Sequence, residues 1–104
     1  MSRVMVQLNR TFTVSGLDGD LLDKHTDLVI QELLKQEAFC GLFDSTVSAD
    51  LGKRVVEIDV CAEADSFEDA VALADSCIRT AIHAAGGHTH DWRTTSTQAE
   101  LVPA

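Results

Sequence analysis

The chain has 104 residues, a usual size for a single domain. It contains 8 basic and 17 acidic residues, which give a net charge of −9. A field of this sign repels phosphate backbones and anionic membrane surfaces, so neither a nucleic acid nor a membrane is expected as a partner. The composition, 45% hydrophobic and without an internal linker, predicts one globular domain with an ordered core over residues 3–101.

The cysteines do not follow a disulfide or metal-binding pattern. Cys40, Cys61 and Cys77 lie far apart, form no CxxC or CxH pair, and are odd in number. Buried reduced thiols are therefore expected, and the cytoplasm is the expected compartment. There is no visible signal peptide, and no apolar run approaches the ~20 residues of a membrane span.

The first element in chain order is a strand over residues 3–14, in which apolar and polar side chains alternate. Arg10 falls on the apolar side of this pattern. Either a bulge at Arg10 or an arginine that reaches past the edge of the core would explain it.

A helix is predicted next, over residues 20–38, because the apolar spacing becomes helical. Asp18 or Asp20 is expected to cap its start, and Gly41 to end it in a left-handed conformation. Its apolar stripe is predicted to contain Leu21, Leu22, Leu28, Val29, Ile30, Leu33 and Leu34.

Residues 42–50 and 54–63 are predicted to form a hairpin, with Gly52 free to take a positive φ in the turn. One face of the first strand is expected to carry Phe43, Ser45, Val47 and Ala49. The second strand is expected to point Val56, Ile58, Val60 and Ala62 inward, and Val55, Glu57, Asp59, Cys61 and Glu63 outward.

The second helix is predicted to begin after Ser66, a good N-cap, and to end at Gly86-Gly87. Its apolar stripe comprises Phe67, Ala70, Val71, Ala74, Cys77, Ile78, Ala81, Ile82 and Ala85. A polar last strand follows over residues 91–101. Strict alternation would place Trp92, Thr94, Ser96 and Gln98 on one face and Arg93, Thr95, Thr97 and Ala99 on the other.

The resulting order is β-α-β-β-α-β, an α+β fold in which two helices cover one face of a four-stranded antiparallel sheet. The opposite face has no helix left to cover it. We therefore expect an interface or a ligand site on that face, formed by Asn9, Thr11, Glu57, Asp59 and Cys61.

Other candidate groups carry weaker signals. His88, His90 and Asp91 could hold a metal ion, but an HxHD segment without a second pair of ligands is more typical of a solvated loop, so no metal or cofactor is assigned. His25 is expected at the boundary of the core and His83 in solvent. The row of Glu57, Asp59 and Glu63 could serve acid–base chemistry, and Cys61 could be a nucleophile, but nothing nearby supplies a base, so no catalytic residue is assigned.

The element order is similar to the ferredoxin-like superfold. An RNA-recognition branch would need aromatic and basic side chains on the central strands, where Thr11, Thr13, Glu57 and Asp59 lie instead. The loop after the first strand has neither the CxxC of a metallochaperone nor the anion loop of an acylphosphatase. Small-molecule-sensing domains and dimeric αβ-barrel proteins stay open.

Four stretches carry a resemblance to a set of small, uncharacterised actinobacterial proteins, and this resemblance extends over most of the chain. The four stretches are residues 44–51, 55–60, 63–70 and 78–87. This resemblance implies a bacterial cytoplasm and no particular activity.

Three functional hypotheses follow. The first is an interaction module without catalytic activity that self-associates, as a dimer, through its open sheet face or an edge strand, with a protein partner as a further option. The second is a regulatory domain that binds a small ligand or a metal. The third is a small enzyme of the dimeric αβ-barrel type, with His25 or Cys61 as its reactive group.

Overall fold

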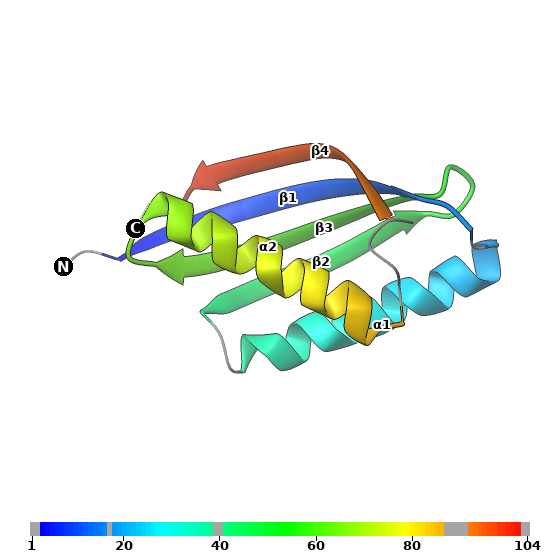
Figure 1. The fold of residues 1–104 in the computed structure, drawn as a ribbon, viewed down its shortest axis with the longest axis horizontal. Helices are drawn as coiled ribbons and strands as arrows, with labels where there is room; N and C mark the ends of the chain where they lie inside the picture. The colour runs from blue at the N-terminus through cyan, green and yellow to red at the C-terminus, as the bar shows by residue number, and fades with distance from the viewer. Residues whose placement is uncertain (1–2, 17, 39–40, 87–91, 103–104) are drawn as a thin grey trace.

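A computed structural model describes residues 3–16, 18–38, 41–86 and 92–102. Its elements are β1 (Val4–Val14), α1 (Gly19–Glu37), β2 (Leu42–Asp50), β3 (Val55–Ala64), α2 (Phe67–Ala84) and β4 (Trp92–Leu101). The strands form one antiparallel sheet in the order β2-β3-β1-β4, and both helices lie on the same side of it (Figure 1). The predicted ferredoxin-like α+β fold is confirmed.

The core lies between the sheet and the helices. The inward side chains of β3 are buried as predicted, and they meet alternate residues of β1 and one side of each helix. Small residues of α2, namely Ala70, Ala74 and Ala81, are fully buried. Because these side chains are short, the helix axis can lie close to the strands below it.

The predicted helix starts are confirmed by their caps. The carboxylate of Asp18 accepts a hydrogen bond from the backbone N–H of Leu21 at 2.8 Å, and the hydroxyl of Ser66 accepts one from Asp69 at 3.1 Å. Each cap satisfies a backbone donor that has no partner within its helix. The second helix is followed by Gly86 at a φ of 93°, as expected for a glycine stop.

The predicted apolar stripes are too wide. Leu21, Leu28 and Leu34 of α1 are 49%, 45% and 51% exposed, and Phe67 of α2 is 40% exposed. The residues of α1 that are buried, Leu22, Thr26, Val29 and Leu33, form a narrower stripe. In Figure 1 α1 runs along the β2 side of the sheet, so it packs with one narrow face and leaves both flanks of that face in solvent.

Two glycine predictions are wrong. Gly41 does not have a positive φ; instead, a Cβ added there would lie 2.8 Å from the backbone oxygen of Glu63, so the position requires a residue without a side chain. In the hairpin turn the positive φ belongs to Arg54, at 57°, and not to Gly52.

Two bulges break the predicted alternation. In β2 the register shifts between Phe43 and Thr46, with Asp44 at a φ of 53°, so Phe43 pairs with Cys61 and leaves the face of Val47. In β4, Thr95 is the extra residue. Trp92 and Thr94 therefore pair with core residues of β1, whereas Ser96 and Gln98 lie on the opposite, open face.

Arg10 reaches past the edge of the core, which is one of the two explanations that the sequence left open for this residue. It stays in register with Ile58 and Thr97, so β1 has no bulge at this residue. Its guanidinium group forms an ion pair with Asp75 of α2, which also pairs with Arg79 at 3.2 Å. The arginine therefore links the sheet to the helix above it.

Candidate functional site

The open face of the sheet brings the five predicted site residues together on its two central strands. Asn9 lies opposite Asp59, Thr11 opposite Glu57, and Cys61 opposite Gln7. All point away from the helices, because residues two apart on a strand share a face, and Leu8, Ile58 and Val60 on the alternate face are buried. No described helix covers this face (Figure 1).

Asn9 is the centre of a polar cluster on this face. Its side-chain amide donates to Glu57 Oε1 at 2.6 Å and to Asp59 Oδ1 at 2.7 Å. Carboxylates two residues apart on a strand lie about 7 Å apart, and the amide bridges them through its two hydrogens. An open depression of about 230 Å³ lies over this cluster; it is lined by Gln7, Asn9, Glu57, Asp59, Gln98 and Glu100.

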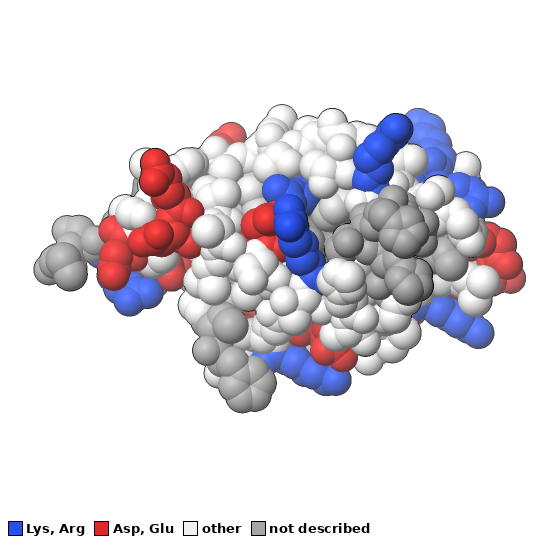
Figure 2. All heavy atoms as spheres, viewed as in Figure 1, with Lys and Arg blue, Asp and Glu red and all other residues white. Residues whose placement is uncertain are grey.

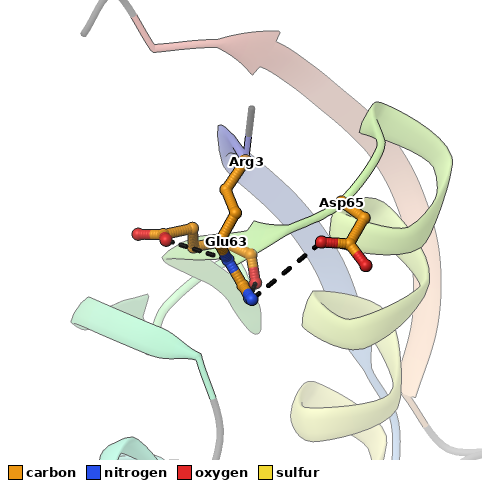
Figure 3. A network of polar contacts seen from close by, with 3 residues as sticks. All are labelled: Arg3, Glu63 and Asp65. Carbon is orange, nitrogen blue, oxygen red and sulfur yellow. Dashed lines mark hydrogen bonds and ion pairs between the residues drawn. The ribbon is translucent and has the colours of Figure 1, made fainter. Parts of the chain in front are cut away.

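The third carboxylate of the predicted row, Glu63, forms an ion pair with an arginine. Figure 3 shows Arg3 reaching across the end of β3, where its Nε lies 3.0 Å from Glu63 Oε1 and its Nη2 donates to the backbone oxygen of Glu63 at 3.2 Å. Asp65 lies 4.0 Å from the same guanidinium. Glu57 and Asp59, the other two carboxylates of the row, have the uncharged amide of Asn9 as their partner.

Cys61 is poorly suited to act as a nucleophile. Burial raises the pKa of its thiol, and the carboxylates of Asp44 and Asp59 raise it further. A thiol with a raised pKa is mostly protonated at neutral pH, and the protonated form is a weak nucleophile.

His25 performs a structural task on the other side of the sheet. Its Nε2 donates to the backbone oxygen of Ala85 at 2.7 Å, at the end of α2, and its ring packs edge-on against Trp92 with centroids 6.0 Å apart. It is half-buried, as expected of a boundary residue. Since Cys61 is on the open face, the sheet separates these two candidates of the enzyme hypothesis.

Searches of protein-family models and of curated proteins found no match to this chain.

The metal hypothesis has no support in the described part of the chain. His88, His90 and Asp91 lie outside the described residues. Within the described ranges, no three His, Cys, Asp or Glu side chains are grouped closely enough to hold an ion.

His83 is exposed, as predicted. Neither helix in these ranges has the length and apolar character needed to cross a bilayer.

The two edges of the sheet differ. Edge β2 is interrupted by its bulge, and the N–H of Ser45 donates to Glu37 Oε1 of α1 at 3.0 Å. At the opposite edge, β4 has β1 as its only neighbouring strand among the described residues. The central residues of β4, Thr94 to Thr97, are exposed and uncharged. Strand β4 was not among the predicted site residues, although its four consecutive hydroxyl-bearing residues between two charges are visible in the sequence.

The helix side of the molecule also has a hollow. It measures about 320 Å³ and is lined by Arg10, Phe67, Glu68, Val71, Ala72 and Asp75. Figure 2 shows this side: charged side chains are scattered among uncharged ones, except at the end where α2 begins, where acidic residues gather. Leu101 of β4, near that end, is 59% exposed.

Proposed function

We propose that this chain is an interaction module without catalytic activity, and that it associates with a second copy of itself through an uncovered part of its sheet. The observation that carries the proposal is a pair of surfaces that no described element covers: one face of the sheet and the β4 edge. Sheets in stable proteins usually have their edges shortened, charged or covered. Strand β4 has ten residues and no charge in its middle, so it is neither shortened nor charged there.

Of these two surfaces, the edge is the better candidate for self-association. The open face carries Glu57, Asp59 and Glu100 around its central depression, and stacking two copies face to face would bring these carboxylates together. Like charges at an interface oppose association. Strand β4 has one charge of each sign, Arg93 and Glu100, so two copies can meet there without net repulsion.

Light scattering coupled to size exclusion, over a range of protein concentrations, tests this proposal. We expect the mass to rise to twice that of one chain, and Asp59→Arg on the open face to leave the rise unchanged. A chain that stays monomeric at hundreds of micromolar would contradict the proposal. A loss of the dimer in Asp59→Arg alone would move the interface to the open face.

A second candidate function is binding of a small cationic ligand in the depression over Asn9. Two carboxylates held side by side, with a third at Glu100, favour an amine or guanidinium group. Calorimetry with spermidine should show binding that weakens with salt and is lost in Glu57→Gln/Asp59→Asn. Titration with zinc tests the metal version, and an absence of heat with both probes removes this candidate.

The proposed compartment is the bacterial cytoplasm. It is supported by the resemblance to actinobacterial proteins and by Cys61, which forms no disulfide among the described residues. Cysteine-directed mass spectrometry of the protein purified under non-reducing conditions tests this: reduced thiols are expected, and disulfide-linked peptides would contradict the proposal.

A further inference from the structure

We infer that two copies pair β4 to β4 in antiparallel orientation, about a two-fold axis at Thr97, so that Arg93 of each copy lies opposite Glu100 of the partner subunit. This inference rests on the proposed self-association and specifies the residues that form it. It follows from three properties of β4: the direction of its backbone groups, its bulge and its two charges.

The backbone direction comes from the contact with β1. The N–H of Val102 donates to the oxygen of Met5 at 2.8 Å, so the backbone groups of Val102 point toward β1. Strand geometry alternates, which turns the groups of Thr97, Ala99 and Leu101 to the free edge. Beyond the bulge, Arg93 lies opposite Thr13, an odd-numbered residue of β1 like Met5, so the groups of Trp92 and Thr94 point to the free edge as well.

The residues whose backbone groups point to the free edge pair with one another when a second copy of β4 is placed antiparallel to the first. Thr97 meets Thr97 of the partner subunit, Thr94 meets the partner's Ala99, and Trp92 meets the partner's Leu101. Every one of these residues presents its N–H and C=O to the other strand, as the hydrogen-bonded pairs of an antiparallel ladder must.

The bulge is what makes the match possible. Between Thr94 and Thr97 the strand has two residues, Thr95 and Ser96, whereas between Thr97 and Ala99 it has one, Gln98. In the antiparallel arrangement the first segment lies opposite the second, so two residues face one on both sides of the axis. That is the residue count of a β-bulge, and Thr95 is already the extra residue in the pairing with β1.

The two charges of β4 then become complementary. Arg93 and Glu100 are both exposed and both lie on the open face, opposite Thr13 and Gln7 of β1. In the paired strands they occupy a non-hydrogen-bonded position, where side chains of facing strands are closest. The two-fold axis generates the contact twice.

The arrangement also accounts for an exposed apolar residue and closes after two copies. Leu101, 59% exposed in one chain, lies across from Trp92 of the partner subunit. The outer edges of the resulting eight-stranded sheet are the two β2 strands. In each of them the N–H of Ser45 is already bound to Glu37 and is not available to a further strand, so the sheet is expected to end there.

Charge reversal tests this register. Arg93→Glu and Glu100→Arg each turn both contacts into repulsions, which should raise the dimer's Kd by about tenfold or more in low salt. An equimolar mixture of the two variants restores both opposite-charge contacts, so its Kd should return to within about threefold of the wild-type value. Lys24→Glu and Asp27→Arg, on the exposed side of α1, make the same changes in net charge and should leave the Kd unchanged.

A cysteine cross-link gives an independent measurement. In the proposed register the Cα atoms of the two Thr97 residues lie about 5.5 Å apart, within the range of a disulfide. Thr97→Cys should therefore form a covalent dimer on mild oxidation. Thr46→Cys on β2 and the wild-type chain are the controls, and both should stay largely uncross-linked.

The outcomes separate this inference from the proposed function. Complementation of the mixed variants together with the Thr97 cross-link supports the register. A wild-type dimer that is indifferent to both charge reversals overturns the register and leaves self-association standing. A wild-type chain that is monomeric at every concentration overturns both.

Discussion

Asn9 is the residue that allows two carboxylates to share the centre of the open face. Its amide satisfies one oxygen each of Glu57 and Asp59 with hydrogen bonds to charged acceptors, which are stronger than neutral ones. The sequence predicted that these three residues share a face, because the period of a strand is two. It did not predict the contact between them, because the register of two strands distant in sequence is not encoded in either strand alone.

Replacing this amide by a third carboxylate should be costly in a salt-dependent way. Asn9→Asp removes both donors and adds a like charge, and we expect a loss of about 1–2 kcal/mol in the free energy of unfolding at pH 7. The loss should shrink as salt is added, because ions screen the repulsion between the three carboxylates. Urea unfolding at low and high salt measures it. Ser15→Asp, which adds the same charge in an exposed turn, should show a much smaller effect.

Cys61 should react slowly with alkylating reagents. Burial and the nearby carboxylates of Asp44 and Asp59 raise the pKa of this thiol, so at neutral pH a smaller fraction is thiolate than in free cysteine. The rate should increase as the pH rises, and the folded state should lose stability there, because a group with a raised pKa in the folded state favours folding only while it is protonated.

Mass spectrometry of the peptide that contains Cys61, after timed exposure to iodoacetamide, measures this rate. Asp59→Asn should increase it by a few-fold, whereas Asp50→Asn, which removes a charge at the far end of the hairpin, should not. A wild-type rate above that of free cysteine would contradict the expectation.

Gly41 is needed for its missing side chain. A Cβ at this position would lie 2.8 Å from the oxygen of Glu63, and the strands are tied together there by a 2.9 Å hydrogen bond from Glu63 to Gly41. Gly41→Ala should therefore lower the free energy of unfolding by about 1–3 kcal/mol. Gly19→Ala is the matched control: nothing lies within 4 Å of its added Cβ, so chemical denaturation should show no loss. A glycine after a helix can end the helix with a positive φ, or it can allow the close approach of another backbone segment. The sequence does not distinguish these two roles, which is why the wrong one was predicted for Gly41.

At the scale of elements, the alternation of the strands, the apolar spacing of the helices and the helix caps were predictable, and the bulges were not. The start of each helix follows from a local hydrogen bond between residues three apart, so Asp18 and Ser66 were identifiable from the sequence. The bulge in β4 depends on where β4 meets β1, and the hydroxyl of Thr95 donates to the oxygen of Thr11 at 3.3 Å beside the register shift. This hydrogen bond joins residues that are 84 positions apart, which is why the bulge was not predictable from β4 alone.

The contact between β1 and α2 makes an asymmetric prediction. Asp75→Ala leaves Arg10, 15% exposed and with its Nε unbonded, without its carboxylate, and should cost about 2 kcal/mol of unfolding free energy. Arg10→Met removes the buried charge and keeps an apolar side chain of similar length, and should be nearly neutral. Denaturant unfolding of both variants and of the double variant tests this. A larger loss in Arg10→Met than in Asp75→Ala would show that the ion pair itself stabilises the fold.

At the scale of the whole molecule, the order of elements fixed the architecture. Two helices separated by a hairpin, with one strand at each end, leave few arrangements in which both apolar helix faces are buried, and the ferredoxin-like one was predicted correctly. The bare face of the sheet follows from that arrangement. The difference between the two edges was not predictable, because it arises from the contact between Glu37 and Ser45, which belong to different elements.

The net charge of −9 should make the stability of the folded chain depend on salt. Screening of self-repulsion should raise the midpoint of thermal unfolding by a few degrees between about 10 and 150 mM salt. Asp23→Lys/Asp27→Lys, at exposed positions on α1, should reduce this gain. A midpoint that falls with salt would mean that ion pairs such as Arg3–Glu63 outweigh the repulsion, although pairs this exposed usually contribute little.

The chain contains one tryptophan and no tyrosine, and that tryptophan begins β4. Trp92 is 4% exposed, packed edge-on against Phe12 with ring centroids 5.6 Å apart and against the His25 imidazole. The intrinsic fluorescence of the protein therefore reports on a single place, the seating of the last strand on the core. If that strand detaches before the rest of the molecule unfolds, the emission will shift to the red while the helical circular dichroism is still intact.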